Sequence, residues 1–267
     1  MDEPDLDRFL EPFAPGESRD SKEIAAAAKE YLGELRSWLA ALQDRGDAGQ
    51  RVNQAHSDAI DRLLRRLHEF AEFTYYTDAG EIDARVSILA VGGYARREMA
   101  IGSDVDLLFL HDGEEISPLA ARVAEWIQYC LWDAGVEVGA SLRNIDEAIS
   151  LGLEDPTART CVLGARFLAG DATLFNEFAT AVRARLFPDL AGFVADQREL
   201  WNQRHAKFGD SLYLLQPNVK EGAGTLRDYH AAYWIARGAQ PSVRNVDDLL
   251  HFGLLTEPEM NEYRDAL

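Results

Sequence analysis

The sequence predicts an α/β fold in which a small sheet lies inside a shell of helices. The first observation is a pair of short apolar runs, at 84–93 and 104–111, that are typical of buried neighbouring strands. The second is an alternating run at 136–143, which follows a helix predicted over about 118–133. The third is the helical periodicity that dominates the chain before and after this block. The order strand, strand, helix, strand therefore defines the predicted core.

The N-terminal part is predicted to be helical. Residues 1–20 are rich in proline and acidic residues, so we expect them to form an acidic flexible lead-in. Apolar side chains then recur at helical spacing over 21–43 and again over 53–73. We therefore expect an N-terminal helical segment over 21–80, and we place the core domain at 81–152.

Residues 153–267 are predicted to form a second, helical domain. Its helices are expected at about 156–168, 171–186, 189–208 and 224–237. A loop rich in proline and glycine, "YLLQPNVKEGAGT", interrupts them. A last helix starts near Thr256 and reaches the end of the chain without a C-cap signal. We therefore expect this domain to be truncated at its C-terminal end.

The composition argues against some classes of function. The 267 residues carry a formal net charge of -19, which disfavours a broad surface for DNA or RNA phosphates. No nucleic-acid partner is expected, although a local pocket for one nucleotide is compatible with this charge. The apolar runs are shorter than the ~18 residues that cross a bilayer, so we expect no membrane partner and a cytoplasmic location. Cys130 and Cys161 lie outside CxxC patterns and are expected to be buried free thiols.

One stretch, "VGGYARREMAIGSDVDLLFL" (91–110), predicts a binding site. Residues i and i+2 of a strand point to one face, so Asp104 and Asp106 are expected side by side. Carboxylates that close repel each other, and oxygen ligands on a short tether suit Mg²⁺, which would relieve the repulsion. Gly92 and Gly93 let the backbone approach phosphate groups with its N–H groups. The alternative is an exposed edge strand whose two aspartates are merely solvated.

The order of these residues resembles that of the polymerase-β-like nucleotidyltransferase superfamily. A strand, Gly-Gly, ten residues, Asp-x-Asp and a second strand follow one another, with Ser103 directly before the first aspartate. The resemblance implies a small mixed sheet with helices, flanked by N-terminal helices and a C-terminal helical region. It also implies that Asp104 and Asp106 are catalytic and hold Mg²⁺, while Ser103 and the two glycines contact the β- and γ-phosphates of a nucleoside triphosphate. An acceptor hydroxyl would attack the α-phosphorus in line and expel diphosphate.

A second stretch, 204–237, narrows the resemblance to one family. "RHAKFGDSLYLLQPNVKEGAGTLRDYHAAYWIAR" is similar to the segment after the transferase core in bacterial uridylyltransferases (uridylyl-removing enzymes) of the signal protein PII. "LWDAGVEVGASLRNIDEA", "GARFLAGD" and "VDDLLHFGLLTEPEMNEYRDAL" are similar as well, so the resemblance covers about 50–267. It implies transfer of UMP from UTP to a tyrosine hydroxyl of PII, in nitrogen regulation. Only the transferase part is expected here, without the HD and ACT domains of that family.

Two alternatives stay open. One is a nucleotidyltransferase with another nucleotide or acceptor, for example in protein adenylylation, because spacing does not reveal base-selecting contacts. The other is a non-catalytic nucleotide-binding signalling module, because "GGYARREM" departs from the family's Gly-Gly-Tyr-Gly-Arg-Gly-Glu-Leu. Ala95 and Arg97 replace glycines, which weakens activity if either glycine is needed for a positive φ or for close backbone approach. Alternatively, Arg97 adds charge near the triphosphate.

The remaining site residues are expected on the third predicted strand and in loops. The superfamily often supplies a third carboxylate from that strand, and Glu137 is its only acidic candidate, with a glutamate at the rim as the alternative. Arg96 follows the Gly-Gly pair and Lys220 lies beside a Gly-rich loop, so both are candidates for nucleotide-binding cations. A surface role is the alternative for Lys220, and Arg227 is expected to pin the loop by pairing with a neighbouring carboxylate.

Overall fold

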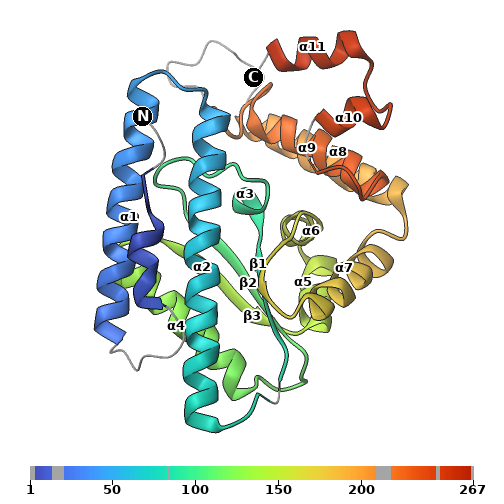
Figure 1. Ribbon diagram of the computed structural model, residues 1–267. Helices are drawn as coiled ribbons and strands as arrows, with labels where there is room; N and C mark the ends of the chain where they lie inside the picture. Colours follow the sequence, from blue (N-terminus) through green and yellow to red (C-terminus); the bar gives the residue numbers. More distant parts are fainter. Residues whose placement is uncertain (1–3, 14–20, 83, 209–217, 245–246, 266–267) are drawn as a thin grey trace. The chain divides into compact units, whose positions relative to one another are not determined.

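The computed structural model describes residues 4–13, 21–82, 84–208, 218–244 and 247–265 of the chain. These residues form a mixed α/β structure, which confirms the predicted fold class (Figure 1). Among the described helices, none combines the length and the apolar character that a membrane span requires.

The chain divides into two compact units. The first contains Met1–Leu151 and Ala165–Thr180, and the second contains Gly152–Gly164 and Ala181–Leu267. The sequence places the boundary between the core domain and the helical domain after residue 152. The structure differs from that expectation because residues 165–180 return to the first unit, where they add a strand to its sheet.

A four-stranded sheet forms the centre of the first unit. Its strands are β1 (Val86–Ala90), β2 (Val105–His111), β3 (Val138–Arg143) and β4 (Arg166–Gly170). They lie in the order β3-β2-β1-β4, with β2 and β3 parallel and with β1 antiparallel to both of its neighbours. The three predicted strands are confirmed, and the sheet is mixed as expected.

The fourth strand is the part of the sheet that the sequence pattern does not predict. The prediction of a helix over 156–168 is wrong in its second half, because α6 (Pro156–Leu163) ends earlier and β4 follows it. A five-residue run is too short to distinguish a helical period from a strand period. The partner of β4 is also distant in the sequence, since Ser87 lies opposite Gly170, so local pattern cannot indicate it.

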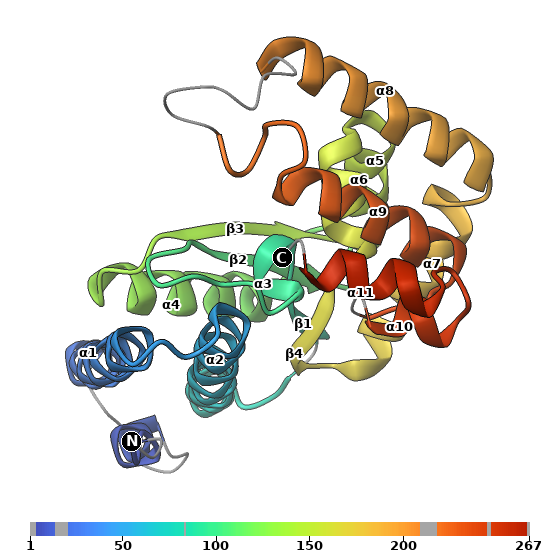
Figure 2. The ribbon, with the colours of Figure 1, turned by 90° about the horizontal axis from the view of Figure 1, so that it is seen from above.

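Three long helices gather on one face of the sheet (Figure 2): α1 (Ser21–Asp44), α2 (Gly49–Ala79) and α4 (Pro118–Asp133). Their apolar stripes and the strands share one continuous core, in which Leu64 and Ile127 are fully buried. This is the arrangement expected of amphipathic helices, which bury the side chains that recur at helical spacing. The three helices predicted for this part of the chain are confirmed.

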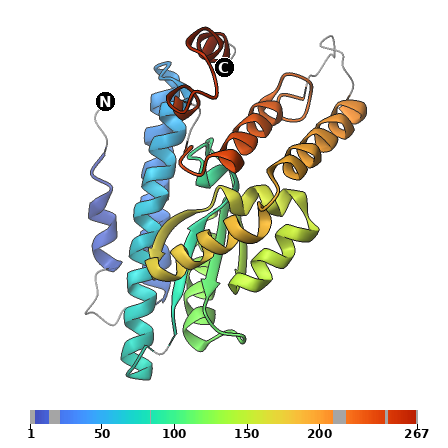
Figure 3. The same cartoon turned by 90° about the vertical axis from the view of Figure 1, so that its right-hand side faces the viewer.

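A short 3₁₀ helix, η1 (Asp7–Phe13), lies beside α1 (Figure 3). Leu6, Leu10 and Phe13 are buried in the core of the first unit. This differs from the flexible lead-in expected from composition, because three apolar side chains at helical spacing attach the segment despite its acidic residues. The other residues of the expected lead-in, 1–3 and 14–20, lie outside the described ones.

The second unit is helical, as predicted. It contains α6, the end of α7 (Ala172–Leu186) and four later helices: α8 (Leu190–Phe208), α9 (Leu226–Ala239), α10 (Asp247–His251) and α11 (Glu257–Asp265). The guanidinium of Arg237 on α9 donates its Nε–H to the carbonyl of Leu163 at the end of α6, at 2.9 Å. Side-chain bonds of this kind satisfy the carbonyls that a helix end leaves without partners.

Candidate active site

The carboxylate of Asp106 occupies a slot between two glycines. Asp106 lies on β2 directly opposite Gly139 of the parallel strand β3. A Cβ atom added to Gly139 would lie 2.5 Å from Asp106 Oδ1, and one added to Gly92 would lie 2.8 Å from Oδ2. Neither glycine therefore tolerates a side chain while the carboxylate holds this position. Gly139 was not among the predicted site residues, because the slot depends on the register between two strands.

Asp104 and Glu137 lie at the same end of neighbouring strands. Asp104 is exposed and directly precedes β2, while Glu137 is exposed and directly precedes β3. The carbonyl of Glu137 accepts a hydrogen bond from the N–H of Val105 at 2.9 Å, which extends the ladder in which Val105 lies opposite Val138. The register therefore aligns Glu137 with Asp104 along the sheet.

The described residues contain no group of three or more His, Cys, Asp or Glu side chains arranged to hold a metal ion. Glu137 thus does not complete a three-carboxylate cluster with Asp104 and Asp106 in this structure. The two aspartates remain the predicted donor set for a metal at this end of the sheet. Their oxygen atoms suit a hard cation that draws its other ligands from substrate and water.

The Gly92–Gly93 turn connects β1 to the site. A single helical turn, α3 (Gly92–Ala95), begins two residues after β1 ends, and Gly92 has a φ of +60°. This is the left-handed region, which glycine adopts without the steric cost of a Cβ atom. The N–H of Val91 donates to the carbonyl of Asp106 at 3.1 Å, so the turn begins beside the metal-ligand candidate. The structure therefore brings together Gly92 and Asp106, as the sequence predicts.

Arg96 and Ser103 both lie in the segment between β1 and β2, Arg96 in its first half and Ser103 near its end. Arg96 donates to the carbonyl of Gly92 at 3.1 Å and to Glu98 Oε2 at 2.7 Å. It therefore braces the turn and is already paired with a carboxylate. The N–H of Ser103 donates to the carbonyl of Ala100 at 3.0 Å, in the bend directly before Asp104. Contacts of Arg96 and Ser103 with phosphate remain predictions.

Of the two residues that replace family glycines, only Arg97 has a left-handed backbone, with a φ of +61°. Ala95 is helical and buried. The side chain of Arg97 is directed to α2, where it forms an ion pair with Asp58 and lies 4.0 Å from a carboxylate oxygen of Asp61. The charge of Arg97 is thus paired with carboxylates on α2.

A buried ion cluster behind the turn was not predicted. Asp61 of α2, only 2% exposed, accepts hydrogen bonds from the Tyr94 hydroxyl at 2.7 Å and from two guanidinium nitrogens of Arg166 at 2.5 and 3.0 Å. Burial, with the added charge of Asp61, raises the pKa of Tyr94 well above its usual value. Burial alone would lower the pKa of Arg166, but its hydrogen bonds to Asp61 and the negative charge around it together outweigh this and raise the pKa. A charged residue on the apolar stripe of α2 is the sequence signal for this cluster.

The loop that contains Lys220 belongs to the second unit, and hydrogen bonds and an ion pair from nearby side chains hold its conformation. Asn218 Oδ1 accepts hydrogen bonds from the N–H groups of Lys220 and Glu221 at 3.0 and 2.9 Å. Arg227 pairs with Glu221 at 3.3 Å, which confirms its predicted role of pinning the loop. Asp228 accepts from the N–H of Gly224 at 2.7 Å and so fixes the other side of the loop. Lys220 itself is exposed, and its proposed contact with the triphosphate remains a prediction.

Sequence models of two protein families match the chain. The GlnD PII-uridylyltransferase model matches residues 192–267, which lie in the second unit. The DUF294 nucleotidyltransferase model matches residues 33–140, a range that includes the Gly-Gly turn, both aspartates and Gly139. Each match thus covers a different part of the chain.

Three curated relatives share the name bifunctional uridylyltransferase/uridylyl-removing enzyme. The protein from Erythrobacter litoralis is 37% identical over 84% of this chain, and the one from Novosphingobium aromaticivorans is 36% identical over 95%. The protein from Rhodospirillum rubrum is 37% identical over 91% of this chain. The matched region is 24%, 28% and 26% of these relatives, so the chain spans about a quarter of their length. Most of the chain is thus similar to PII-uridylyltransferases, and the part that contains the candidate site matches a nucleotidyltransferase family.

Proposed function

We propose that this chain transfers UMP from UTP to a tyrosine hydroxyl of a PII signal protein, with Mg²⁺ as cofactor and diphosphate as the second product. The names of the curated relatives support transfer of a uridylyl group, and the name of the matching family model supports PII as the acceptor. The observation that carries the proposal is the slot in which the Asp106 carboxylate occupies the space that a side chain on Gly92 would need. It joins a metal-ligand candidate to a turn that can receive phosphate groups.

Mg²⁺ fits the donor set of this site. It binds hard oxygen ligands and is commonly held by one or two carboxylates, with phosphates and water completing its octahedron. Asp104 and Asp106 would supply those carboxylates, whereas a structural zinc site would need nitrogen or sulfur ligands. When bound, the metal would neutralise negative charge on the triphosphate and on the leaving diphosphate.

The remaining residues would bind the nucleotide and move one proton. The backbone N–H groups of Gly92 and Gly93, with Ser103, would bind the β- and γ-phosphates, and Arg96 and Lys220 would supply positive charge. The tyrosine oxygen forms a bond to the α-phosphorus while the bond from that phosphorus to the bridging oxygen breaks, and diphosphate leaves. Glu137 would accept the proton of the tyrosine hydroxyl as a general base.

The test is transfer of labelled UMP to purified PII in the presence of UTP and Mg²⁺. The variant Asp104→Asn is expected to abolish labelling, because it removes one charged metal ligand without changing the shape of the side chain. Asp133→Asn is a matched control, since Asp133 is also exposed but lies at the end of α4. Absence of labelling by the intact wild-type protein would contradict the proposal.

Two other outcomes correspond to the alternatives. Labelling of PII from ATP or CTP but not from UTP would indicate another nucleotide specificity. Binding of UTP without any transfer by the intact protein would indicate a nucleotide-binding signalling module.

A further inference from the structure

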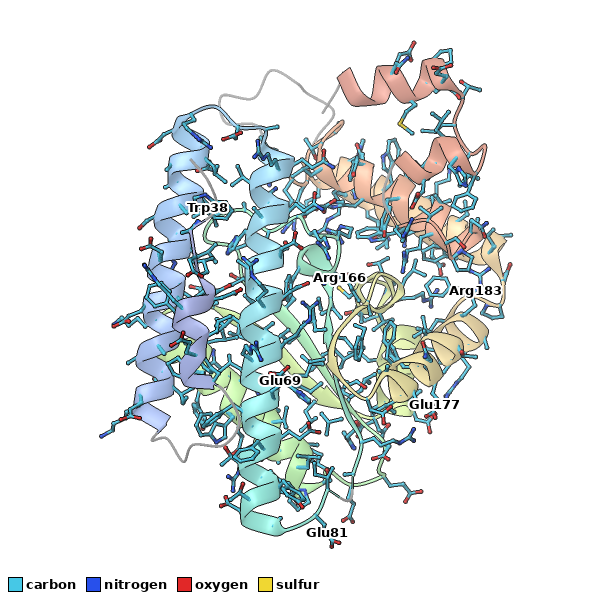
Figure 4. All side chains as sticks on the ribbon, in the orientation of Figure 1. Trp38, Glu69, Glu81, Arg166, Glu177 and Arg183 are labelled. Carbon is cyan, nitrogen blue, oxygen red and sulfur yellow. The ribbon has the colours of Figure 1, made fainter. Side chains whose placement is uncertain are left out.

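Arg166 contacts α3, the helical turn that begins with Gly92 and Gly93, at its last two residues. Its Nε–H donates to the carbonyl of Ala95 at 3.2 Å, and an Nη2–H donates to the carbonyl of Tyr94 at 3.3 Å. The guanidinium carbon also lies 5.3 Å from the centre of the Tyr94 ring. Figure 4 labels Arg166 beside α3, in agreement with these contacts. One side chain therefore holds the last two residues of the turn.

The pairing of β4 with β1 places Arg166 at this position. Arg166 is the first residue of β4 and lies opposite Ala90, the last residue of β1. The chain leaves β1 at that point to form the turn, so the strand pairing places the guanidinium directly beside it. A short helical turn such as α3 leaves carbonyl groups without helical partners, and Arg166 donates to that of Ala95. It adds a further bond to the carbonyl of Tyr94, which also accepts from the N–H of Arg97 at 3.1 Å.

Asp61 fixes the orientation of the guanidinium. The two nitrogens that reach Asp61 form a bidentate pair with its carboxylate, a geometry that only arginine provides. A buried carboxylate without such a partner is costly, so the pair is strongly favoured. The Tyr94 hydroxyl binds the same carboxylate, and Tyr94 is itself part of the turn.

We propose that Arg166 is a positioning residue for nucleotide transfer: held by Asp61, it keeps the Gly92–Gly93 turn in the conformation that receives the triphosphate. This inference rests on the function proposed above. Gly92, the first residue of α3, lies against the Asp106 carboxylate, and Arg166 binds the carbonyls of the last two residues of α3. A displacement of these last residues would therefore change the position of Gly92 relative to the Asp106 carboxylate.

The test compares Arg166→Lys with wild type in the intact protein. Lysine keeps the positive charge but cannot form the bidentate pair and the two bonds to the turn together. Binding of a UTP analogue with a non-hydrolysable α–β bridge, with Mg²⁺, is measured by calorimetry. The Kd is expected to rise by about 10- to 100-fold, as for other supporting residues of a binding site. The KM for UTP should rise in parallel, with a smaller change in kcat.

Arg65→Lys is the matched control. Arg65 lies 3.6 Å from the same Asp61 carboxylate and donates to the carbonyl of Leu168, but its side chain is 47% exposed and, in the described part of the chain, it forms no hydrogen bond or ion pair with α3. Its substitution is expected to leave the Kd unchanged. Equal Kd values for wild type and a folded Arg166→Lys protein would overturn the inference, even if the melting temperature of that variant were lower.

A second variant covers the case in which Arg166→Lys does not fold. Tyr94→Phe removes one hydrogen bond to Asp61 and keeps the ring, so the fold should be retained and the Kd should rise less than in Arg166→Lys. An unchanged Kd in Tyr94→Phe would then overturn the inference. Failure of the wild-type protein to bind the analogue would instead contradict the proposed function itself.

Discussion

Substituting Arg97 tests whether the left-handed backbone at this position stores strain. A non-glycine residue in the left-handed region costs roughly 1–2 kcal/mol relative to the helical region. Glycine relieves that cost but loses about 0.5–1 kcal/mol through the greater freedom of the unfolded chain. Glycine should therefore be more stable than alanine at position 97 by about 1 kcal/mol.

Both variants also lose the ion pair between Arg97 and Asp58, which must be included when their stability is compared with that of wild type. The two side chains are 36% and 45% exposed, and a surface pair of this kind contributes about 0.5 kcal/mol. Arg97→Ala loses the pair and keeps the strain, so it should be less stable than wild type by about 0.5 kcal/mol. Arg97→Gly loses the pair and the strain, so it should be more stable than wild type by a similar amount.

Thermal unfolding of the two variants gives the measurement. A difference of about 1 kcal/mol corresponds to a melting temperature roughly 2–4 °C higher for Arg97→Gly than for Arg97→Ala, in a domain of this size. The same two substitutions at Arg66 are the control, because Arg66 is an exposed residue inside α2 that pairs with Glu69. There, alanine should be more stable than glycine by about 1 kcal/mol. A glycine variant at 97 that melts no higher than the alanine variant would refute the argument from strain.

Three further predictions concern Gly139, His56 and the two cysteines. Gly139→Ala places a Cβ atom 2.5 Å from Asp106 Oδ1, so UMP transfer should fall by about 100-fold, and a variant with wild-type kcat/KM would contradict the slot. Burial lowers the pKa of His56, so the neutral imidazole is favoured in the folded state. The stability that the neutral imidazole contributes to the folded protein is therefore lost as pH falls below about 6.5, where the unfolded chain binds the proton more readily. The variant His56→Gln should flatten the dependence of melting temperature on pH between about 5 and 8, and an unchanged slope would exclude this role. Cys130 is buried as expected, whereas Cys161 is only half-buried. Burial and the charge of Asp133 raise the pKa of Cys130 to about 12, so a thiol reagent followed by mass spectrometry should modify Cys161 and leave Cys130 unmodified in the folded protein.

The parts of the site that local spacing determines could be predicted from the sequence. The alternation of a strand buries Val105 and Leu107 and leaves Asp106 accessible, as the Asp-x-Asp pattern indicates. The left-handed conformation at Arg97 lies where the chain departs from the family's glycine pattern. In both cases the information is contained within a few consecutive residues.

The parts that strand pairing determines could not be predicted. Gly139 matters because β3 is in register with β2, and Arg166 matters because β4 pairs with the distant β1. Asp61 offers a weaker signal, since a carboxylate between Ile60 and Leu64 on an apolar stripe must find a buried partner. Its partner is nevertheless supplied by a strand more than a hundred positions later, as their separation of 105 shows.

The late position of β4 also implies an order of events as the chain is synthesised. Helix α2 and strands β1 and β2 leave the ribosome well before Arg166 does. Until β4 pairs with β1, Asp61 has no bidentate partner, and burying its charge without one would be unfavourable. The Gly92–Gly93 turn is therefore expected to stay hydrated in the nascent chain. It would reach its final conformation only when the last strand of the sheet is added.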